Sequence, residues 1–157
     1  MKLIVNLGLT GLGWAECHIA DETSSCKVTA SYISDALRYL VLAATAVLSG
    51  FRSVTFGFDE EPGEYRWVIS TSRLNEIELT ILSFPELWGD KPDSEGKCLF
   101  RTKCRPRVFA DAVNAAATEI LNTMGECGYA ERWVEYPFPT AQLNELQRLL
   151  ALGHETV

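Results

Sequence analysis

Two short segments of the chain, 59–64 and 86–95, concentrate acidic side chains that could bind a partner or catalyse a reaction. Each holds four carboxylates, and the second also holds a tryptophan. Clustered carboxylates steer the association of a cationic partner, and tryptophan often anchors protein interfaces. Paired carboxylates also serve glycoside hydrolysis, but the sequence shows no sugar-binding groove of aromatic residues, which disfavours that chemistry. The candidate partner-binding residues are Asp59, Glu60, Glu61, Glu64, Glu86, Trp88, Asp90, Asp93 and Glu95, with Tyr65 as a second candidate anchor.

Cysteine and histidine give a weaker signal for catalysis or metal binding. The five cysteines, at positions 17, 26, 98, 104 and 127, form no CxxC pair and no zinc-site spacing. Cys17 and His18 would point to opposite faces of a strand, and the other histidine, His154, is near the C-terminal end of the sequence. We therefore expect reduced thiols, no metal and no cofactor. An alternative stays open: a small enzyme or ligand-binding protein whose pocket, between sheet and helices, uses Cys17, His18 or Trp67.

The segment 97–107 opposes the acidic character of the rest of the chain. It holds five cations and no acid, so the remaining residues carry a net charge of −12 against −7 for the whole chain. In an extended segment, alternating cations would line one face and could grip the phosphates of single-stranded nucleic acid. We favour cross-strand pairing with acidic neighbours, because the net charge opposes nucleic acid and no RNA-stacking motif is present. The cations are Lys97, Arg101, Lys103, Arg105 and Arg107.

The elements that must position these residues are read from apolar periodicity. Apolar residues at every second position predict strands, and apolar residues at every third or fourth position predict helices. The predicted strands are 2–9, 13–20, 26–30, 54–58, 65–69, 77–81 and 97–103. The predicted helices are 33–48, capped by Ser31 or Ser34, then 106–125, a short one at 129–134, and a last one capped by Thr140. This order predicts an α+β fold with an antiparallel sheet, made of an N-terminal hairpin plus a four-strand meander, packed by two main helices and a C-terminal helix.

A meander would bring the two acidic segments together. The turn between its first and second strands and the turn between its third and fourth strands emerge at the same end of the sheet. We therefore expect 59–64 and 86–95 to share one acidic rim, offset by Lys91. The rim would be a docking surface for a basic protein partner. Two solvated turns with Trp88 folded onto the core are the alternative.

Composition and charge limit the classes of protein to which the chain can belong. Hydrophobic residues make up 47% and charged residues 22% of the 157 residues, as is usual for one folded domain, so we expect a single globular domain over 1–157. No apolar run reaches the ~20 residues of a membrane span, and the N-terminal apolar stretch is too short for a signal peptide. We expect a cytoplasmic protein. Its net charge of −7 disfavours nucleic acid and anionic membranes as partners and favours basic proteins.

Three segments, EEPGEYRW at 60–67, LWGD at 87–90 and WVEYPFP at 133–139, resemble a pattern met in small bacterial proteins. In size, charge and architecture the chain also resembles the immunity proteins of bacterial contact-dependent growth inhibition and related polymorphic toxin systems. That resemblance implies a non-enzymatic protein that neutralises a cognate toxin domain by binding it. It implies no particular binding residues, so the rim is assigned from charge and predicted topology.

Overall fold

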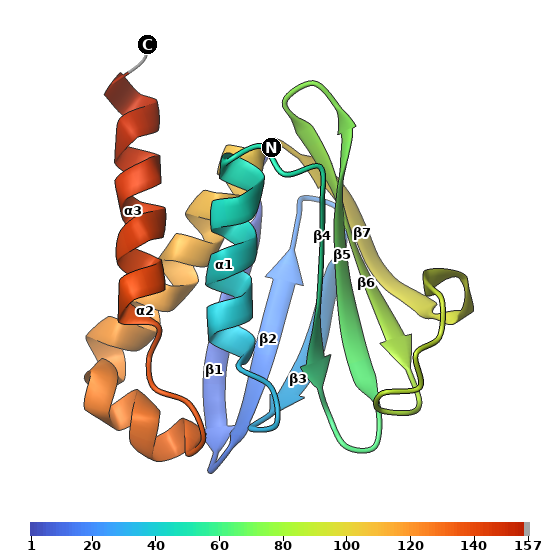
Figure 1. Ribbon diagram of the computed structural model, residues 1–157, viewed down its shortest axis with the longest axis vertical. Coiled ribbons are helices and arrows are strands. Elements are labelled where there is room, and N and C mark those ends of the chain that lie inside the picture. The colour runs from blue at the N-terminus through green and yellow to red at the C-terminus, as the bar shows by residue number, and fades with distance from the viewer. Residues whose placement is uncertain (156–157) are drawn as a thin grey trace.

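Seven strands and three longer helices make up the computed structural model (Figure 1), which describes residues 1–155 and the side chains of residues 1–153. Strands β1 (Ile4–Gly11), β2 (Trp14–Ala20) and β3 (Ser25–Ser31) form one antiparallel sheet. Strands β4 (Ser53–Asp59), β5 (Glu64–Arg73), β6 (Glu76–Phe84) and β7 (Lys97–Cys104) form a second sheet in meander order. The helices are α1 (Ala36–Leu48), α2 (Pro106–Trp133) and α3 (Thr140–Glu155), with a short 3-10 helix η1 (Asp93–Glu95) before β7. The predicted α+β class is confirmed, and the structure further divides the strands into two sheets.

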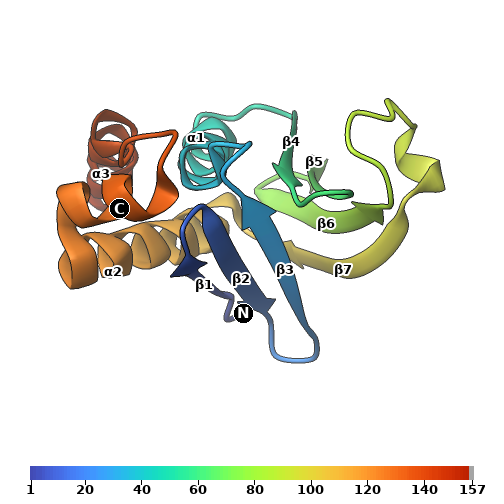
Figure 2. The same ribbon diagram turned by 90° about the horizontal axis from the view of Figure 1, so that it is seen from below.

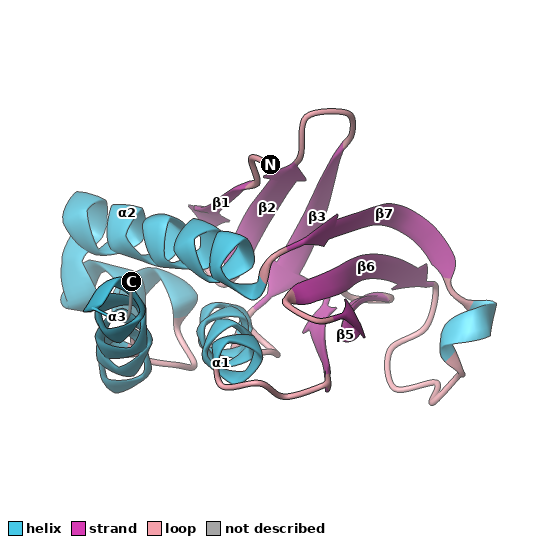
Figure 3. Ribbon diagram, turned by 90° about the horizontal axis from the view of Figure 1, so that it is seen from above, coloured by secondary structure: helices cyan, strands magenta, loops and turns pink. Residues whose placement is uncertain are grey.

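The helices gather on one side of the molecule and the four-stranded sheet lies on the other, as Figure 2 shows. Helix α1 lies between them, in contact with α2, α3 and β4, while α2 packs along β1. The two sheets meet where β3 contacts β4 and β7. Viewed from above, the loop that contains η1 extends beyond the far edge of the four-stranded sheet (Figure 3). The second acidic loop, 86–95, therefore lies away from the three longer helices (Figure 3).

Alternating burial explains why the predicted runs form strands. On β5, Trp67 and Ile69 are buried while their neighbours Arg66 and Val68 are only partly covered, which is the period of two expected of a half-buried strand. The central strand β6 is buried on both faces over Leu79–Leu82. These strands share one hydrophobic core with all three helices. The core fixes the register of the meander, because a slip of one residue would turn its apolar side chains outward.

The helix boundaries confirm the predicted break in α2 and correct the predicted caps. Thr140 is the first residue of α3 and not its N-cap, and its hydroxyl donates a hydrogen bond to Glu126. Gly125 has φ 69° and interrupts α2 at the position where the sequence predicted a break. Helix α1, however, is capped by neither predicted serine: its N-cap is Asp35, which makes no side-chain capping hydrogen bond. The Ser34 hydroxyl instead accepts a hydrogen bond from the Asp59 N–H at 3.1 Å. That bond ties the start of α1 to the end of β4, where the first acidic loop begins.

Candidate functional site

The two acidic loops meet at one end of the four-stranded sheet, as the meander predicted. The Leu87 N–H donates a hydrogen bond to the Pro62 carbonyl at 2.7 Å, which joins the loops directly. Gly63 lies against the Phe84 carbonyl, where an added Cβ would sit 2.5 Å from the oxygen. A Pro-Gly pair such as Pro62-Gly63 is typical of the middle of a type II turn, but Gly63 does not have the positive φ that this turn requires. The close approach of its backbone to Phe84 explains the glycine instead. We call the surface formed by 59–64 and 86–95 the acidic rim.

Arg66 fastens the second loop to the sheet. Its Nη1 donates to the Lys91 carbonyl at 2.7 Å and to Asp93 Oδ1 at 2.9 Å, while Nη2 donates to Glu64 Oε1 at 3.1 Å. The guanidinium carbon lies 4.1 Å from the centre of the Phe84 ring, a cation–π contact. Burial would lower the pKa of Arg66, but its bonds to Asp93 and Glu64 outweigh that effect and raise it. Charge-assisted bonds of this kind hold a fixed geometry better than neutral ones.

Four of the eight rim carboxylates are committed to the fold. Glu64 and Asp93 bind Arg66, and Glu60 accepts a 2.8 Å hydrogen bond from the Thr29 hydroxyl. Asp59 is half-buried; burial, helped by the charge of Glu64, raises the pKa of its carboxyl. These four side chains therefore shape the rim, although the Asp93 side chain stays 54% exposed.

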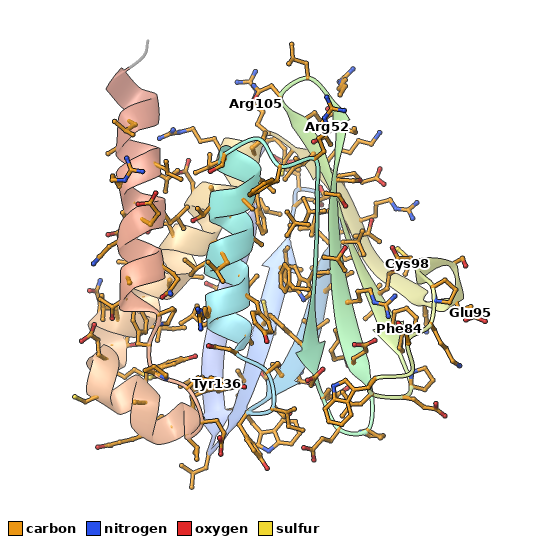
Figure 4. All side chains as sticks on the ribbon, in the orientation of Figure 1. Arg52, Phe84, Glu95, Cys98, Arg105 and Tyr136 are labelled. Atoms are coloured by element: carbon orange, nitrogen blue, oxygen red, sulfur yellow. The ribbon has the colours of Figure 1, made fainter. Side chains whose placement is uncertain are left out.

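The other four carboxylates are exposed and have no hydrogen bond or ion pair to any described residue. Lys91 lies in the second loop and Lys97 directly after it, and neither forms an ion pair with these carboxylates. Figure 4 shows one of the four, Glu95, pointing away from the sheet. Unpaired surface carboxylates on adjoining loops produce a local negative potential that attracts cations. These residues are Glu61, Glu86, Asp90 and Glu95.

Trp88 stands out among these carboxylates, with 73% of its surface exposed. Its φ is 53° and that of Asp90 is 50°, in the left-handed region that bulky residues rarely occupy. The contacts of Arg66 and Leu87 hold this backbone in place. The alternative in which Trp88 folds onto the core is wrong. Tyr65, the second candidate anchor, is only partly exposed, and burial together with the charge of Glu60 raises its pKa, so it is the poorer anchor.

No family model, curated protein or solved structure matches this chain. Among the described side chains, those of residues 1–153, no group of three or more His, Cys, Asp and Glu is placed to hold a metal ion. No helix within residues 1–155 is long and apolar enough to cross a membrane. The charge, exposure and geometry of the rim therefore define what it can bind.

The basic segment 97–107 does not form one cationic stripe. Arg101 and Lys103 lie on β7 and each approaches Glu78 of β6 at 3.9 Å, which is the cross-strand pairing favoured by the sequence. Strand β7 ends before Arg105, and Arg107 belongs to α2, where its Nη2 donates to the Leu150 carbonyl at 2.8 Å. The extended cationic face that could bind the phosphates of a single strand is therefore not present in segment 97–107.

The residues of the small-molecule alternative are not brought together. Cys17 and Trp67 are both 0% exposed in the core, so no ligand can reach either side chain. Burial, helped by the charge of Cys26, raises the pKa of the Cys17 thiol to about 12, which suppresses the thiolate. His18 is exposed and lies 3.7 Å from Glu16 beside a shallow groove of about 270 Å³. The side chain of His154 is outside the described part of the chain.

Arg66 is the residue of the site that sequence analysis missed. It lies between the two acidic segments in the sequence, and this position is the feature from which an ion pair with them could have been predicted. It stands one residue before Trp67 in a strand, so its side chain leaves the core face and can reach the loop that follows β6. The role of Gly63 is not evident in the sequence either, because its close approach to Phe84 depends on pairing across the sheet.

Proposed function

We propose that this chain is a cytoplasmic immunity protein that neutralises a cognate toxin domain by direct binding, without enzymatic activity, and that the acidic rim contacts the toxin. One observation carries the proposal: four unpaired carboxylates and an exposed tryptophan share two loops that Arg66 and Leu87 hold together. The resemblance to immunity proteins of contact-dependent growth inhibition supports the choice of partner.

The unpaired carboxylates favour a basic toxin surface. A domain that acts on nucleic acid carries lysine and arginine where it meets phosphates, and a rigid set of carboxylates can occupy the same cations. Charge complementarity of this kind mainly accelerates association and selects among partners. The rim would therefore block the toxin at the surface that the toxin needs for its substrate.

Trp88 supplies the apolar anchor of the proposed interface. Its left-handed backbone, held by neighbouring contacts, keeps the indole exposed before any partner arrives. A side chain fixed in its bound position loses little entropy on binding, which raises affinity. Truncating Trp88 to alanine should therefore mainly accelerate dissociation, whereas changing the carboxylates should mainly slow association.

The experiment uses the C-terminal domain encoded by the gene immediately upstream as the candidate toxin. A triple variant reverses three unpaired rim charges: Glu61→Lys, Glu86→Lys and Asp90→Lys. A control reverses three exposed carboxylates far from the rim and has the same net charge: Glu119→Lys, Glu131→Lys and Glu135→Lys. At low salt the rim variant should associate at least about tenfold more slowly than the control and should fail to restore growth of toxin-expressing cells.

Equal association rates for the two variants would remove the rim from the interface. An upstream domain that is neither toxic nor bound by the wild-type chain would contradict toxin neutralisation itself.

A further inference from the structure

A second exposed surface lies at the opposite end of the four-stranded sheet. It is a groove of about 680 Å³ between the end of α1, the β5–β6 turn and the start of α2. A smaller groove of about 370 Å³ lies on the other side of the same turn. Strand β5, with ten residues, spans the distance from the acidic rim to this turn, about 30 Å at ~3.3 Å per residue. We call the two grooves and the turn between them the basic end.

Cations surround the basic end. Arg52, Arg73 and Arg107 line the larger groove, and Lys103 and Arg105 line the smaller one. Figure 4 shows Arg52 and Arg105 at this end, away from Glu95. Glu76 is the acid that lines both grooves, and it pairs with Arg73 at 3.2 Å. The Arg73 side chain nevertheless remains 78% exposed. The side chains of Arg52 and Arg105 have no acidic partner among the described residues.

Apolar side chains accompany these cations. Leu74, at the tip of the β5–β6 turn, is 97% exposed, and Phe51 beside the larger groove is 64% exposed. Exposed apolar side chains next to unpaired charges are typical of an interaction surface. The groove is large enough to accept an aromatic side chain between Phe51 and Leu74, because pockets of about 300–1,000 Å³ enclose whole small ligands.

The partner whose chemistry fits this surface is present on the same chain. The acidic rim offers unpaired carboxylates around one exposed indole, and the basic end offers unpaired guanidinium groups around an apolar groove. The two surfaces lie at opposite ends of the same strands, so they cannot meet within one molecule. We infer that the basic end of one copy binds the acidic rim of a second copy, with Trp88 in the groove and the rim carboxylates facing Arg52 and Arg105.

Such a contact joins different surfaces of two identical molecules. It does not close on itself, so it generates short head-to-tail runs whose length depends on concentration. It also covers the acidic rim of every copy except the terminal one. A consequence, which rests on the proposed function, is that a toxin domain would compete with a neighbouring copy for the rim.

Sedimentation equilibrium of the full chain, with no other protein present, tests the inference. At about 10 mM salt the Debye length is about 30 Å, and the average mass should rise with protein concentration. At about 0.5 M salt it should return to that of one chain. A groove variant, Arg52→Glu with Arg105→Glu, and a rim variant, Glu61→Lys with Asp90→Lys, should each remain monomeric, because like charges then face each other.

Mixing the two variants distinguishes this contact from general charge effects. The reversed groove of the first variant fits the reversed rim of the second, and their unaltered surfaces fit as in the wild type. An equimolar mixture should therefore associate although neither variant does alone. A control with Lys27→Glu and Arg132→Glu, two exposed cations elsewhere, should associate like the wild type.

Three results would overturn the inference: a wild-type mass independent of concentration, association by the groove variant, or a mixture that stays monomeric. A monomeric wild type that binds poly-L-glutamate through Arg52 and Arg105 would assign the basic end to an acidic partner other than this chain. Toxin binding is separable, because the groove variant retains the rim and should bind the toxin domain as the wild type does.

Discussion

Replacing Arg66 by alanine should detach the second acidic loop from the sheet. The substitution removes the hydrogen bonds to the Lys91 carbonyl and to Glu64 and Asp93, and with them the contact on Phe84. The Arg66 and Glu64 side chains are only 16% and 15% exposed, so the loss leaves a largely buried carboxylate without a cation. The Asp93 side chain is 54% exposed, and water can replace part of its lost bond.

The magnitude follows from these exposures. Hydrogen bonds to charged groups contribute about 1.5–3 kcal/mol each when shielded, while the exposed Asp93 pair contributes under about 1 kcal/mol. Because these terms are not additive, we expect a loss of about 3 kcal/mol in the free energy of unfolding. For a domain of this size that corresponds to a fall in Tm of about 6–12 °C.

Urea unfolding measures this loss of stability, and native-state hydrogen exchange shows which part of the fold is destabilised. The Leu87 amide, bonded to the Pro62 carbonyl, should exchange faster in the variant, while amides of β1 and β2 keep their protection relative to global unfolding. Arg73→Ala is the matched control, because Arg73 lies on the same strand and pairs with Glu76 but is 78% exposed. It should cost under about 0.5 kcal/mol.

Arg66→Lys separates charge from geometry. Lysine keeps the positive charge but lacks the planar fork that reaches two carboxylates and a carbonyl together, so it should recover less than half of the loss. If Arg66→Ala cost no more than Arg73→Ala, and Leu87 exchange were unchanged, Arg66 would not hold the loop.

Three further predictions concern other parts of the fold. Gly63→Ala should lower the free energy of unfolding by about 1–3 kcal/mol, because its Cβ would lie 2.5 Å from the Phe84 carbonyl oxygen. Gly8→Ala is the control, because the space around Gly8 is open and the added methyl should not lower that free energy. Equal urea midpoints for the two variants would contradict the steric explanation. Asp35 is 4% exposed, and burial raises the pKa of its carboxyl in the folded protein above the ~3.9 of the unfolded chain. Below pH ~3.9 the carboxyl is neutral in both states and costs no stability, whereas above the folded pKa its buried charge destabilises the fold. Asp35→Asn should therefore stabilise the protein at pH 7 and lose that advantage towards pH 4; an advantage that did not change with pH would show that charge burial is not its cause. A thiol reagent should modify the exposed Cys98 and Cys127 of the native protein at once, whereas Cys17 and Cys104, whose pKa values burial raises to about 12 and about 11, should react only after unfolding, and rapid native modification of either would show that its site opens.

The location of the candidate site was predictable from the sequence, while its internal structure was not. Alternating apolar residues define the meander, and a meander places 59–64 and 86–95 at one end whatever the details of packing. Which carboxylates remain unpaired depends on contacts between distant positions. Thr29 reaches Glu60, and Arg66 reaches Asp93, only because the sheets and loops fold together.

The basic segment illustrates the same division. Its five cations are evident in the sequence, and cross-strand pairing with acidic neighbours was the favoured prediction. Which of these cations form ion pairs depends on the register of β6 against β7, which sets Glu78 opposite Lys103. It also depends on where β7 ends, which is before Arg105. The basic end could not be predicted, because it combines the end of α1, the β5–β6 turn and the start of α2.

The sequence by itself determined the α+β class, the order of the strands and helices, the break at Gly125 and the shared end of the two acidic segments. Those features follow from local periodicity and turn chemistry, which act over a few residues. Only the tertiary structure decided the division into two sheets, the role of Arg66, the exposure of Trp88 and the burial of Cys17. Each of these depends on which distant segments exclude water from one another, and burial and charge pairing across the fold are set by packing, which local patterns do not specify.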